Sequence, residues 1–296
     1  MKFKNVVIWG HPLHSHTHSY IHHGFHRAFR YMNYDAHWIN EHANFNSSIF
    51  DSALVITEGQ VDSKIPLNKT ASYLLHNCDT VKYEESGINF KVLQVYSHDC
   101  LDRDVVQLGP AQYYQADNRT LYQTWATDLL PKEMDSIELI TQTSARKPWC
   151  NWVGSVIYGD VHGNEKQLVD FATAASKKSV EFRICRNVSP EDGVSLIRES
   201  YLAPALQGAW QVANGYIPCR IYKNISYGHL GLTNSKAVHD ALDGNIIYNQ
   251  DCTQLFEDGV RAMEAPRESR RSVFEFVRNN HTYVNRAKSI LEVMGY

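Results

Sequence analysis

The chain has 296 residues, of which 43% are hydrophobic and 21% charged, and its formal net charge is −3 at pH 7. This composition predicts a globular protein with a buried core and argues against a disordered chain. The slightly acidic balance argues against a large nucleic-acid-binding surface, which needs a basic face, and no uncharged stretch is long enough for a membrane span. Six scattered cysteines without a CxxC pair predict free thiols and a cytoplasmic location.

The first half of the chain alternates short apolar runs with a segment of helical periodicity. The helical spacing covers residues 19–33, and residues 71–76 fit either a strand or the end of a helix. Strands are predicted at residues 4–10, 36–39, 52–57, 90–96 and 137–141. Because these strands are apolar at nearly every position, we expect a parallel sheet that is covered on both faces, as in α/β proteins.

The pattern breaks at residues 143–149 and a second α/β unit follows. Its strands are predicted at residues 152–158, 180–185, 230–234 and 245–249, and its helices at residues 165–176, 190–205, 221–227 and 268–294. We therefore expect two domains, residues 1–147 and 148–274, with about residues 275–296 packing back on the first. Ligands of open α/β sheets bind beyond the carboxyl ends of the strands, so both domains should point functional loops into a shared cleft.

The most specific motif is GYIPCRIYKNISYGHLGLTNS, at residues 215–235. Arg220 and Lys223 are three residues apart, so they lie on one face of a first helical turn. A helix N-terminus attracts anions because its first N–H groups are unpaired. The motif therefore predicts a diphosphate site.

Residues at two predicted strand ends extend this site. Gly154 and Ser155 lie where backbone can approach a ligand closely, and Arg183 and Arg186 flank the end of the strand VEFRIC. We expect at least one of these arginines to face the ligand.

This half of the chain resembles the donor half of a GT-B glycosyltransferase. RIYK is similar to the R-V-W-E element of phage DNA β-glucosyltransferases, with Lys223 in place of its Glu. YIPCRIYKN is similar to the Y-V-T-E-K-L-x-x-N element of α1,3-fucosyltransferases, with Cys219 in place of its Glu. The resemblance covers roughly residues 150–260 in its motifs and the first half in its topology.

The resemblance implies an α/β GT-B fold, in which two Rossmann-like domains face each other across a cleft. It implies transfer of a sugar from a GDP- or UDP-sugar to a hydroxyl of a glycan or another small-molecule acceptor, with no metal and no further cofactor. Arg220 and Lys223 would neutralise the leaving diphosphate. Hydrogen bonds to sugar or phosphate would come from Asn224, Thr233, Asn234 and Ser235.

Nine of the fifteen histidines lie in the first 42 residues. His14, His16 and His18 lie in the loop after the first strand, where a neutral imidazole can take the proton of an acceptor hydroxyl. We favour His16, at the middle of the loop, as the base of an inverting transfer. Glu58 and Asp99 each follow a strand and are candidates for acceptor-side carboxylates, as base, orienting group or acceptor ligand.

Three alternatives stay open. The segment LHSHTHS is similar to the H-x-H opening of metal-dependent phosphoesterases, and His76, His98, Asp99 and His162 offer further ligands. The chain could also be a non-catalytic nucleotide-sugar-binding module, because the acidic ribose contact of the family elements is absent. A glucosyltransferase that modifies DNA is the third alternative, and the net charge argues against it.

Overall fold

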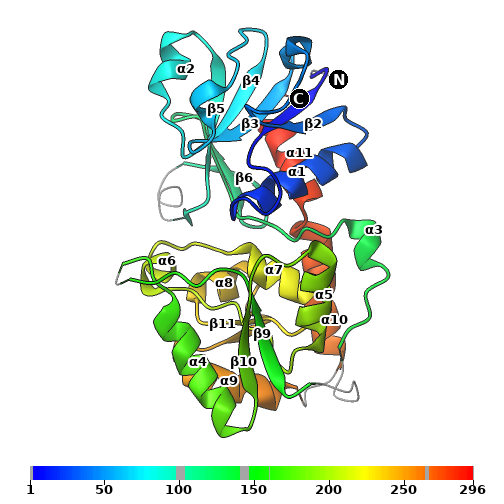
Figure 1. Cartoon of the computed structure of the whole chain (residues 1–296), viewed down its shortest axis with the longest axis vertical. Helices are drawn as coiled ribbons and strands as arrows, with labels where there is room; N and C mark the ends of the chain where they lie inside the picture. The colour runs from blue at the N-terminus through cyan, green and yellow to red at the C-terminus, as the bar shows by residue number, and fades with distance from the viewer. Residues whose placement is uncertain (1–2, 98–103, 141–146, 160, 264–266, 296) are drawn as a thin grey trace. The chain divides into compact units, whose positions relative to one another are not determined.

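The computed structural model describes residues 3–97, 104–140, 147–159, 161–263 and 267–295. Asp99 and His98, two of the candidates named above, lie outside the described residues. The chain forms two compact units (Figure 1). The first unit comprises Met1–Leu130 and Thr282–Tyr296, and the second comprises Pro131–His281.

These divisions lie after residues 130 and 281, whereas the sequence patterns predict boundaries after residues 147 and 274. The segment that follows Leu130 belongs to the second unit because α3 (Pro131–Met134) packs against α10 (Arg267–Asn280). An ion pair of 2.6 Å between Arg278 Nη2 and Asp135 Oδ1 joins the two segments.

The first unit is built on an eight-stranded sheet of order β2-β1-β3-β4-β5-β8-β7-β6. Its strands are β1 Val6–Trp9, β2 Ala36–Ile39, β3 Leu54–Glu58, β4 Ser72–His76, β5 Asn89–Gln94, β6 Val106–Gly109, β7 Gln112–Gln115 and β8 Thr120–Gln123. The six strands from β2 to β8 in this order are parallel, and β7 and β6 are antiparallel. Because β1 is followed in sequence by β2 on one side and then β3 on the other, the topological switch point lies between β1 and β3.

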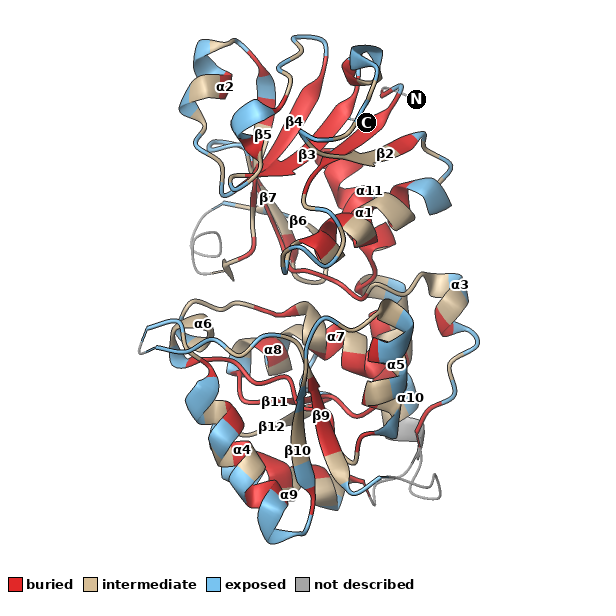
Figure 2. Ribbon diagram, in the orientation of Figure 1, coloured by how far each residue is buried: buried red, intermediate tan, exposed pale blue. Residues whose placement is uncertain are grey.

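Both faces of this sheet are covered, as the apolar strands predict. The central strands are buried along their length (Figure 2). The helical segments of the unit are α1 Ser19–Tyr31, η1 Ser47–Phe50, η2 Asp62–Lys64, α2 Val81–Glu85 and α11 Tyr283–Val293. Helix α11 packs against α1 and reaches β7 and β8. It is fixed there by buried Arg286, whose Nε and Nη2 donate to the carbonyl and hydroxyl oxygens of Thr124 at 2.7 and 2.8 Å.

The second unit has two small parallel sheets, β10-β9 and β11-β12. Its strands are β9 Trp149–Val153, β10 Glu181–Cys185, β11 Leu232–Thr233 and β12 Ile247–Tyr248. An extended segment joins the two sheets, because the Tyr201 N–H donates to the Trp149 carbonyl oxygen and the Ala205 N–H to that of Leu232, at 2.7 and 2.8 Å. The remaining helices are α4 Glu165–Lys177, α5 Pro190–Glu199, α6 Ala209–Ala213, α7 Cys219–Ser226, α8 Lys236–Ala241 and α9 Cys252–Ala262.

Two predicted elements are wrong in the described residues. Residues 137–140 form no strand, and the Ile140 N–H instead donates to the Gly228 carbonyl oxygen at 2.9 Å. The single helix predicted over residues 268–294 is two helices, α10 and α11. The break occurs at Thr282, whose hydroxyl accepts from the Asn285 N–H while the Asn285 side chain accepts from the Thr282 N–H. This capping box starts a new helix.

None of the helices in the described ranges combines the length and the apolar character that crossing a bilayer requires.

Candidate functional site

A cluster of histidines surrounds one carboxylate at the switch point of the first sheet. Strand β1 ends at Trp9, and Gly10 and His11 follow it. A Cβ at Gly10 would lie 2.3 Å from Nδ1 of His22, so only glycine lets α1 approach the strand end this closely. The His11 N–H donates to that same Nδ1 at 3.1 Å. The glycine therefore fixes where His11 leaves the sheet.

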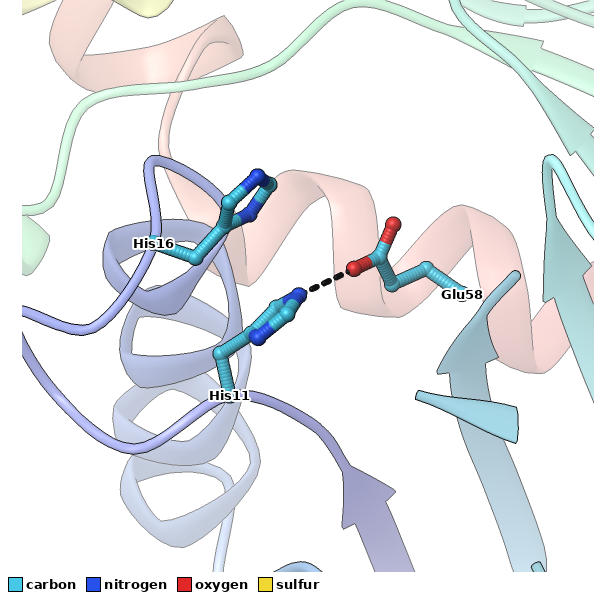
Figure 3. A group of neighbouring side chains, drawn as sticks. All are labelled: His11, His16 and Glu58. Carbon is cyan, nitrogen blue, oxygen red and sulfur yellow. Dashed lines mark hydrogen bonds and ion pairs between the residues drawn. The ribbon is translucent and has the colours of Figure 1, made fainter. Parts of the chain in front are cut away.

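Glu58 is the centre of the cluster. It is the last residue of β3, and only 2% of it is exposed. Its Oε1 lies 2.5 Å from Nε2 of His11, and its Oε2 lies 2.9 Å from Nδ1 of His18 (Figure 3 shows the His11 contact). Since a carboxylate only accepts hydrogen bonds, the facing nitrogen of each ring carries the proton.

Glu58 is ionised over the neutral range. Burial alone would raise the pKa of its carboxyl, but hydrogen bonds and positive charge from His18 and then His11 outweigh burial and lower it to about 2. The site therefore holds a buried negative charge whose side-chain hydrogen-bond partners, among the described residues, are His11 and His18.

His18 has the geometry of an oriented base. Its Nδ1–H donates to Glu58, so the lone pair of the neutral ring lies on Nε2. No described residue forms a hydrogen bond with that Nε2 atom. The ring lies against Trp125 and His76, with centroid distances of 6.1 and 5.5 Å. A carboxylate that fixes the tautomer of an imidazole is the arrangement that general-base histidines need.

His16, which the sequence favours as the base, is arranged differently. Its Nδ1 accepts the His18 N–H at 3.2 Å, so the neutral ring carries its proton on Nε2. Burial, and then the neighbouring His11 and His18, lower the pKa of His16. The ring stays close to His11, with centroids 4.3 Å apart. A neutral His16 in this tautomer is a hydrogen-bond donor toward a substrate.

His14 lies apart from the cluster, although it belongs to the same loop. It is exposed, with φ at +67°, and its Nδ1 contacts the Tyr20 hydroxyl at 3.0 Å. His76 lies inside the unit, where its Nδ1–H donates to the Leu93 carbonyl oxygen at 3.1 Å. The histidines of LHSHTHS therefore separate: the rings of His16 and His18 lie together, with centroids 5.0 Å apart, and His14 lies outside the cluster.

Three side chains of the cluster could together hold a metal ion. One ligand atom each from His11, His16 and Glu58 lies within 4.8 Å of the others (Figure 3). Two imidazole nitrogens and a carboxylate oxygen form a donor set that zinc and related divalent ions use. Of these residues, the sequence interpretation named His16 and Glu58 but missed His11, whose position directly after a strand and a glycine was the available signal.

The second unit carries a basic site at the end of β9. Arg220, in the first turn of α7, stacks on Trp152 with its guanidinium carbon 3.6 Å from the ring centroid. Its Nε donates to the Val153 carbonyl oxygen at 3.3 Å. Gly154 has φ at +138°, and a Cβ there would lie 2.3 Å from Nη2 of Arg220. Gly154 and Arg220, which the sequence assigns to the same donor site, therefore lie in contact.

The charge of Arg220 is not neutralised by any described carboxylate. Burial lowers the pKa of its guanidinium, yet an arginine keeps its charge at every physiological pH. Arg183 offers a contrast, because it stacks on Trp149 at 3.7 Å and pairs with Glu181 Oε2 at 2.5 Å. One stacked arginine is thus neutralised, and the other presents a desolvated positive charge at a strand end.

The other predicted donor-site residues are divided between surface and core. Ser155 and Arg186 are exposed beyond the ends of β9 and β10, and Lys223 is half-buried one turn along α7 from Arg220. Asn224 is buried and donates to the Ala203 carbonyl oxygen at 2.8 Å.

The Thr233–Ser235 run is also buried. Asn234 Oδ1 accepts from the Gln207 N–H, and Asn234 Nδ2 donates to the Gln207 carbonyl oxygen, both at 2.9 Å. Thr233 donates to the Ala205 carbonyl oxygen at 3.3 Å. The Ser235 hydroxyl has no hydrogen-bond partner in the described structure. Asn224 and most of this run thus use their polar groups inside the unit.

Comparisons with known proteins identify the fold. No protein family and no curated protein matches the sequence. The structure is similar to that of the DNA-modifying enzyme β-glucosyltransferase, solved with and without its substrate uridine diphosphoglucose. The TM-score is 0.51, at 10% identity over 98% of this chain and 96% of that chain.

Two weaker likenesses are to a point mutant of TarM from S. aureus, in complex with UDP, and to the glycosyltransferase SnogD from Streptomyces nogalater. The TarM structure has a TM-score of 0.46 and 9% identity over 83% of this chain and 56% of that chain. SnogD has a TM-score of 0.40 and 10% identity over 99% of this chain and 100% of that chain. The fold is assigned from the β-glucosyltransferase alone: the chain has the GT-B fold, built from two Rossmann-like units.

Proposed function

We propose that the protein is a glycosyltransferase that moves a sugar from a nucleotide-diphosphate donor to a hydroxyl group of an acceptor. The observation that carries this proposal is the positive charge of Arg220, which is stacked on Trp152, touches Gly154 and is neutralised by no described carboxylate. Breaking a glycosyl–phosphate bond releases a diphosphate, and fixed positive charge stabilises the charge that develops in the transition state.

The donor site is proposed at the carboxyl end of β9. The Arg220 fork matches phosphate oxygens geometrically, and the glycine allows the backbone to approach the same group. Arg186 and Lys223 are the further cations for the diphosphate, so the proposal needs no metal ion there. The β-glucosyltransferase that shares the fold uses uridine diphosphoglucose, which makes UDP-glucose the first donor to test and a GDP-sugar the second.

The acceptor hydroxyl is proposed to lose its proton to His18. The carboxylate of Glu58 holds Nδ1–H of His18 and leaves Nε2 to accept the proton, while His16 is a donor in its neutral tautomer. Direct displacement with one such base inverts the configuration at the transferred carbon. This assignment replaces His16 by His18 within the same predicted loop, and the acceptor is proposed to be a glycan or another small molecule.

The donor proposal is tested by thermal shift with UDP, GDP, CDP, ADP and dTDP and their sugars. A ligand present at 100 times its Kd should raise the melting temperature by roughly 5–10 °C. Arg220→Ala should remove this shift. Arg183→Ala is the matched control, since it also removes an arginine stacked on a tryptophan but one that Glu181 already neutralises.

An equal shift for Arg220→Ala and the wild type would contradict the donor assignment. A strong shift without any sugar transfer would instead favour a nucleotide-sugar-binding module that has lost catalysis.

A further inference from the structure

We infer that His11, His16 and Glu58 form a binding site for one divalent transition-metal ion, of the class of zinc. The three ligand atoms lie within 4.8 Å of one another. His11 and His16 come from the loop between β1 and α1, and Glu58 comes from the end of β3, so two chain segments converge on one point (Figure 3). All three belong to the first unit, so the inference does not rest on the proposed donor site.

The spacing fits an ion after a small movement of side chains. Zinc binds nitrogen and oxygen ligands at about 2.1 Å, which puts the ligand atoms of a tetrahedral site about 3.4 Å apart. His11 and Glu58 are already closer than this, at 2.5 Å, because they share a proton where the ion would lie. His16 is on a half-exposed loop position and can close the remaining gap by turning its ring.

Neighbouring groups hold two of the ligands in place. The backbone N–H of His11 is bonded to His22, and the second oxygen of Glu58 accepts from Nδ1–H of His18. Partners of this kind orient the ligands of metal sites and contribute to metal affinity. A cation would also neutralise the buried carboxylate of Glu58. Among the described residues, the ionisable side chains within ion-pair distance of this carboxylate are two histidines, His11 and His18.

The protons balance as follows. The ion takes the place of the proton between Nε2 of His11 and Oε1 of Glu58, and that proton leaves to water. His16 binds either through Nδ1, replacing the His18 N–H, or through Nε2, with its proton moving to Nδ1. Either route gives up one hydrogen bond between neutral groups. Three protein ligands leave a coordination position open for water or for a hydroxyl, as in catalytic zinc sites.

The donor set predicts which ions bind. Magnesium and calcium prefer oxygen ligands, so a site with two imidazoles should select zinc or cobalt(II) over both. This selectivity separates the cluster from a surface carboxylate that collects any cation.

The experiment uses the full chain after removal of metals with a chelator. Zinc and cobalt(II) are added alone, and binding is followed by calorimetry, by metal content after dialysis and by the visible absorption of cobalt(II). We expect one ion per chain and a cobalt absorption band. His16→Asn and Glu58→Gln should weaken zinc binding at least about 100-fold, because each removes a ligand and not only its outer partner.

His14→Asn is the matched control, because it removes a histidine of the same loop whose ring contacts Tyr20 outside the cluster. It should bind zinc like the wild type. Equal losses in His14→Asn and His16→Asn would assign binding to the histidine-rich loop at large and overturn the site. Failure to bind one ion per chain would also overturn it.

If Glu58→Gln does not fold, the zinc affinity of His16→Asn alone tests the site. The nucleotide thermal shift reports on Arg220 and should be the same in all these variants, so a failure of this inference is distinguishable from a failure of the donor proposal.

Discussion

Individual side chains decide the two candidate sites through the partners they have. Arg183 and Arg220 both stack on a tryptophan, but Arg183 has an acidic partner, whereas burial lowers the pKa of Arg220. His16 and His18 are two residues apart, and the hydrogen bonds of their Nδ1 atoms are the basis of the opposite roles proposed for them. The chemistry at this scale therefore depends both on contacts two residues apart, as in Arg183–Glu181, and on contacts between distant residues, as in His18–Glu58.

The histidine loop itself could be predicted from the sequence, because the clustered histidines follow the first apolar run. The choice of His16 rested on its position at the middle of the loop. That choice could not include the bond between His18 and Glu58, which joins residues 40 positions apart. Trp152 was missed for the same reason, since an aromatic residue inside a strand reads as core until an arginine stacks on it.

The base assignment predicts the behaviour of His18→Asn. This variant should bind the donor nucleotide as the wild type does and lose sugar transfer by about 10²–10⁴-fold, the usual contribution of a general base. Initial rates at saturating donor, with nucleotide binding measured separately, check it. His42→Asn removes an exposed histidine of the same region and should keep the wild-type rate. Full activity in His18→Asn would return the role to His16.

At the scale of elements, both candidate sites lie at strand ends, and caps set the helix boundaries. The strands β1 and β3 were predicted because nearly uninterrupted apolar runs require a buried sheet. The strand predicted at residues 152–158 overlaps only the last two residues of β9, Trp149–Val153. The strands β6–β8 were not predicted, since each has only four residues and β7 and β8 are built from tyrosines, glutamines, one threonine and one leucine without an apolar run. The α10–α11 break was missed because Thr282 and Asn285 make a capping box in which asparagine takes the place of the usual Glu or Gln.

Helix α11 predicts a stability effect in the first unit. Arg286→Met should destabilise the unit by about 3 kcal/mol, because it removes hydrogen bonds that a buried charged group makes to the Thr124 oxygens in the interior. Hydrogen exchange of peptides from residues 112–123 is the measurement. Lys288→Met changes an exposed position of the same helix and should leave exchange unchanged. Equal exchange in both variants would show that Arg286 does not fix the helix.

For the molecule as a whole, the acid limit of stability is set by buried histidines. Burial lowers the pKa of His76 from 6.5 to about 4, although its bond to the Leu93 carbonyl acts in the opposite direction. In the unfolded chain His76 therefore binds a proton below about pH 6.5, whereas in the folded chain it binds one only below about pH 4. The stability that His76 contributes is complete above pH 6.5 and is lost as the pH falls through this window.

The predicted slope is up to about 1.4 kcal/mol of unfolding free energy per pH unit for each such histidine. His22, with a pKa lowered to about 3 by burial, acts in the same direction. Urea denaturation of the full chain at pH 7, 6 and 5 measures the effect. In His76→Gln the free energy of unfolding should fall less steeply between pH 6.5 and 4.5. Protonation of Glu58, whose pKa is lowered from 4.5 to about 2, changes the stability only below this range. An unchanged slope in this variant would contradict the assignment.

The second unit is one continuous stretch of chain, Pro131–His281, whereas the first also needs the segment that begins at Thr282. A ribosome releases the chain from its N-terminus, and domains usually fold in that order. Here the strands β1–β8 leave the ribosome long before α11, the helix that packs on α1 and reaches β7 and β8. The second unit can therefore complete its core during synthesis while the first still waits for its covering helix. Of the two units, the one whose strands are synthesised first is therefore the one whose core is completed second.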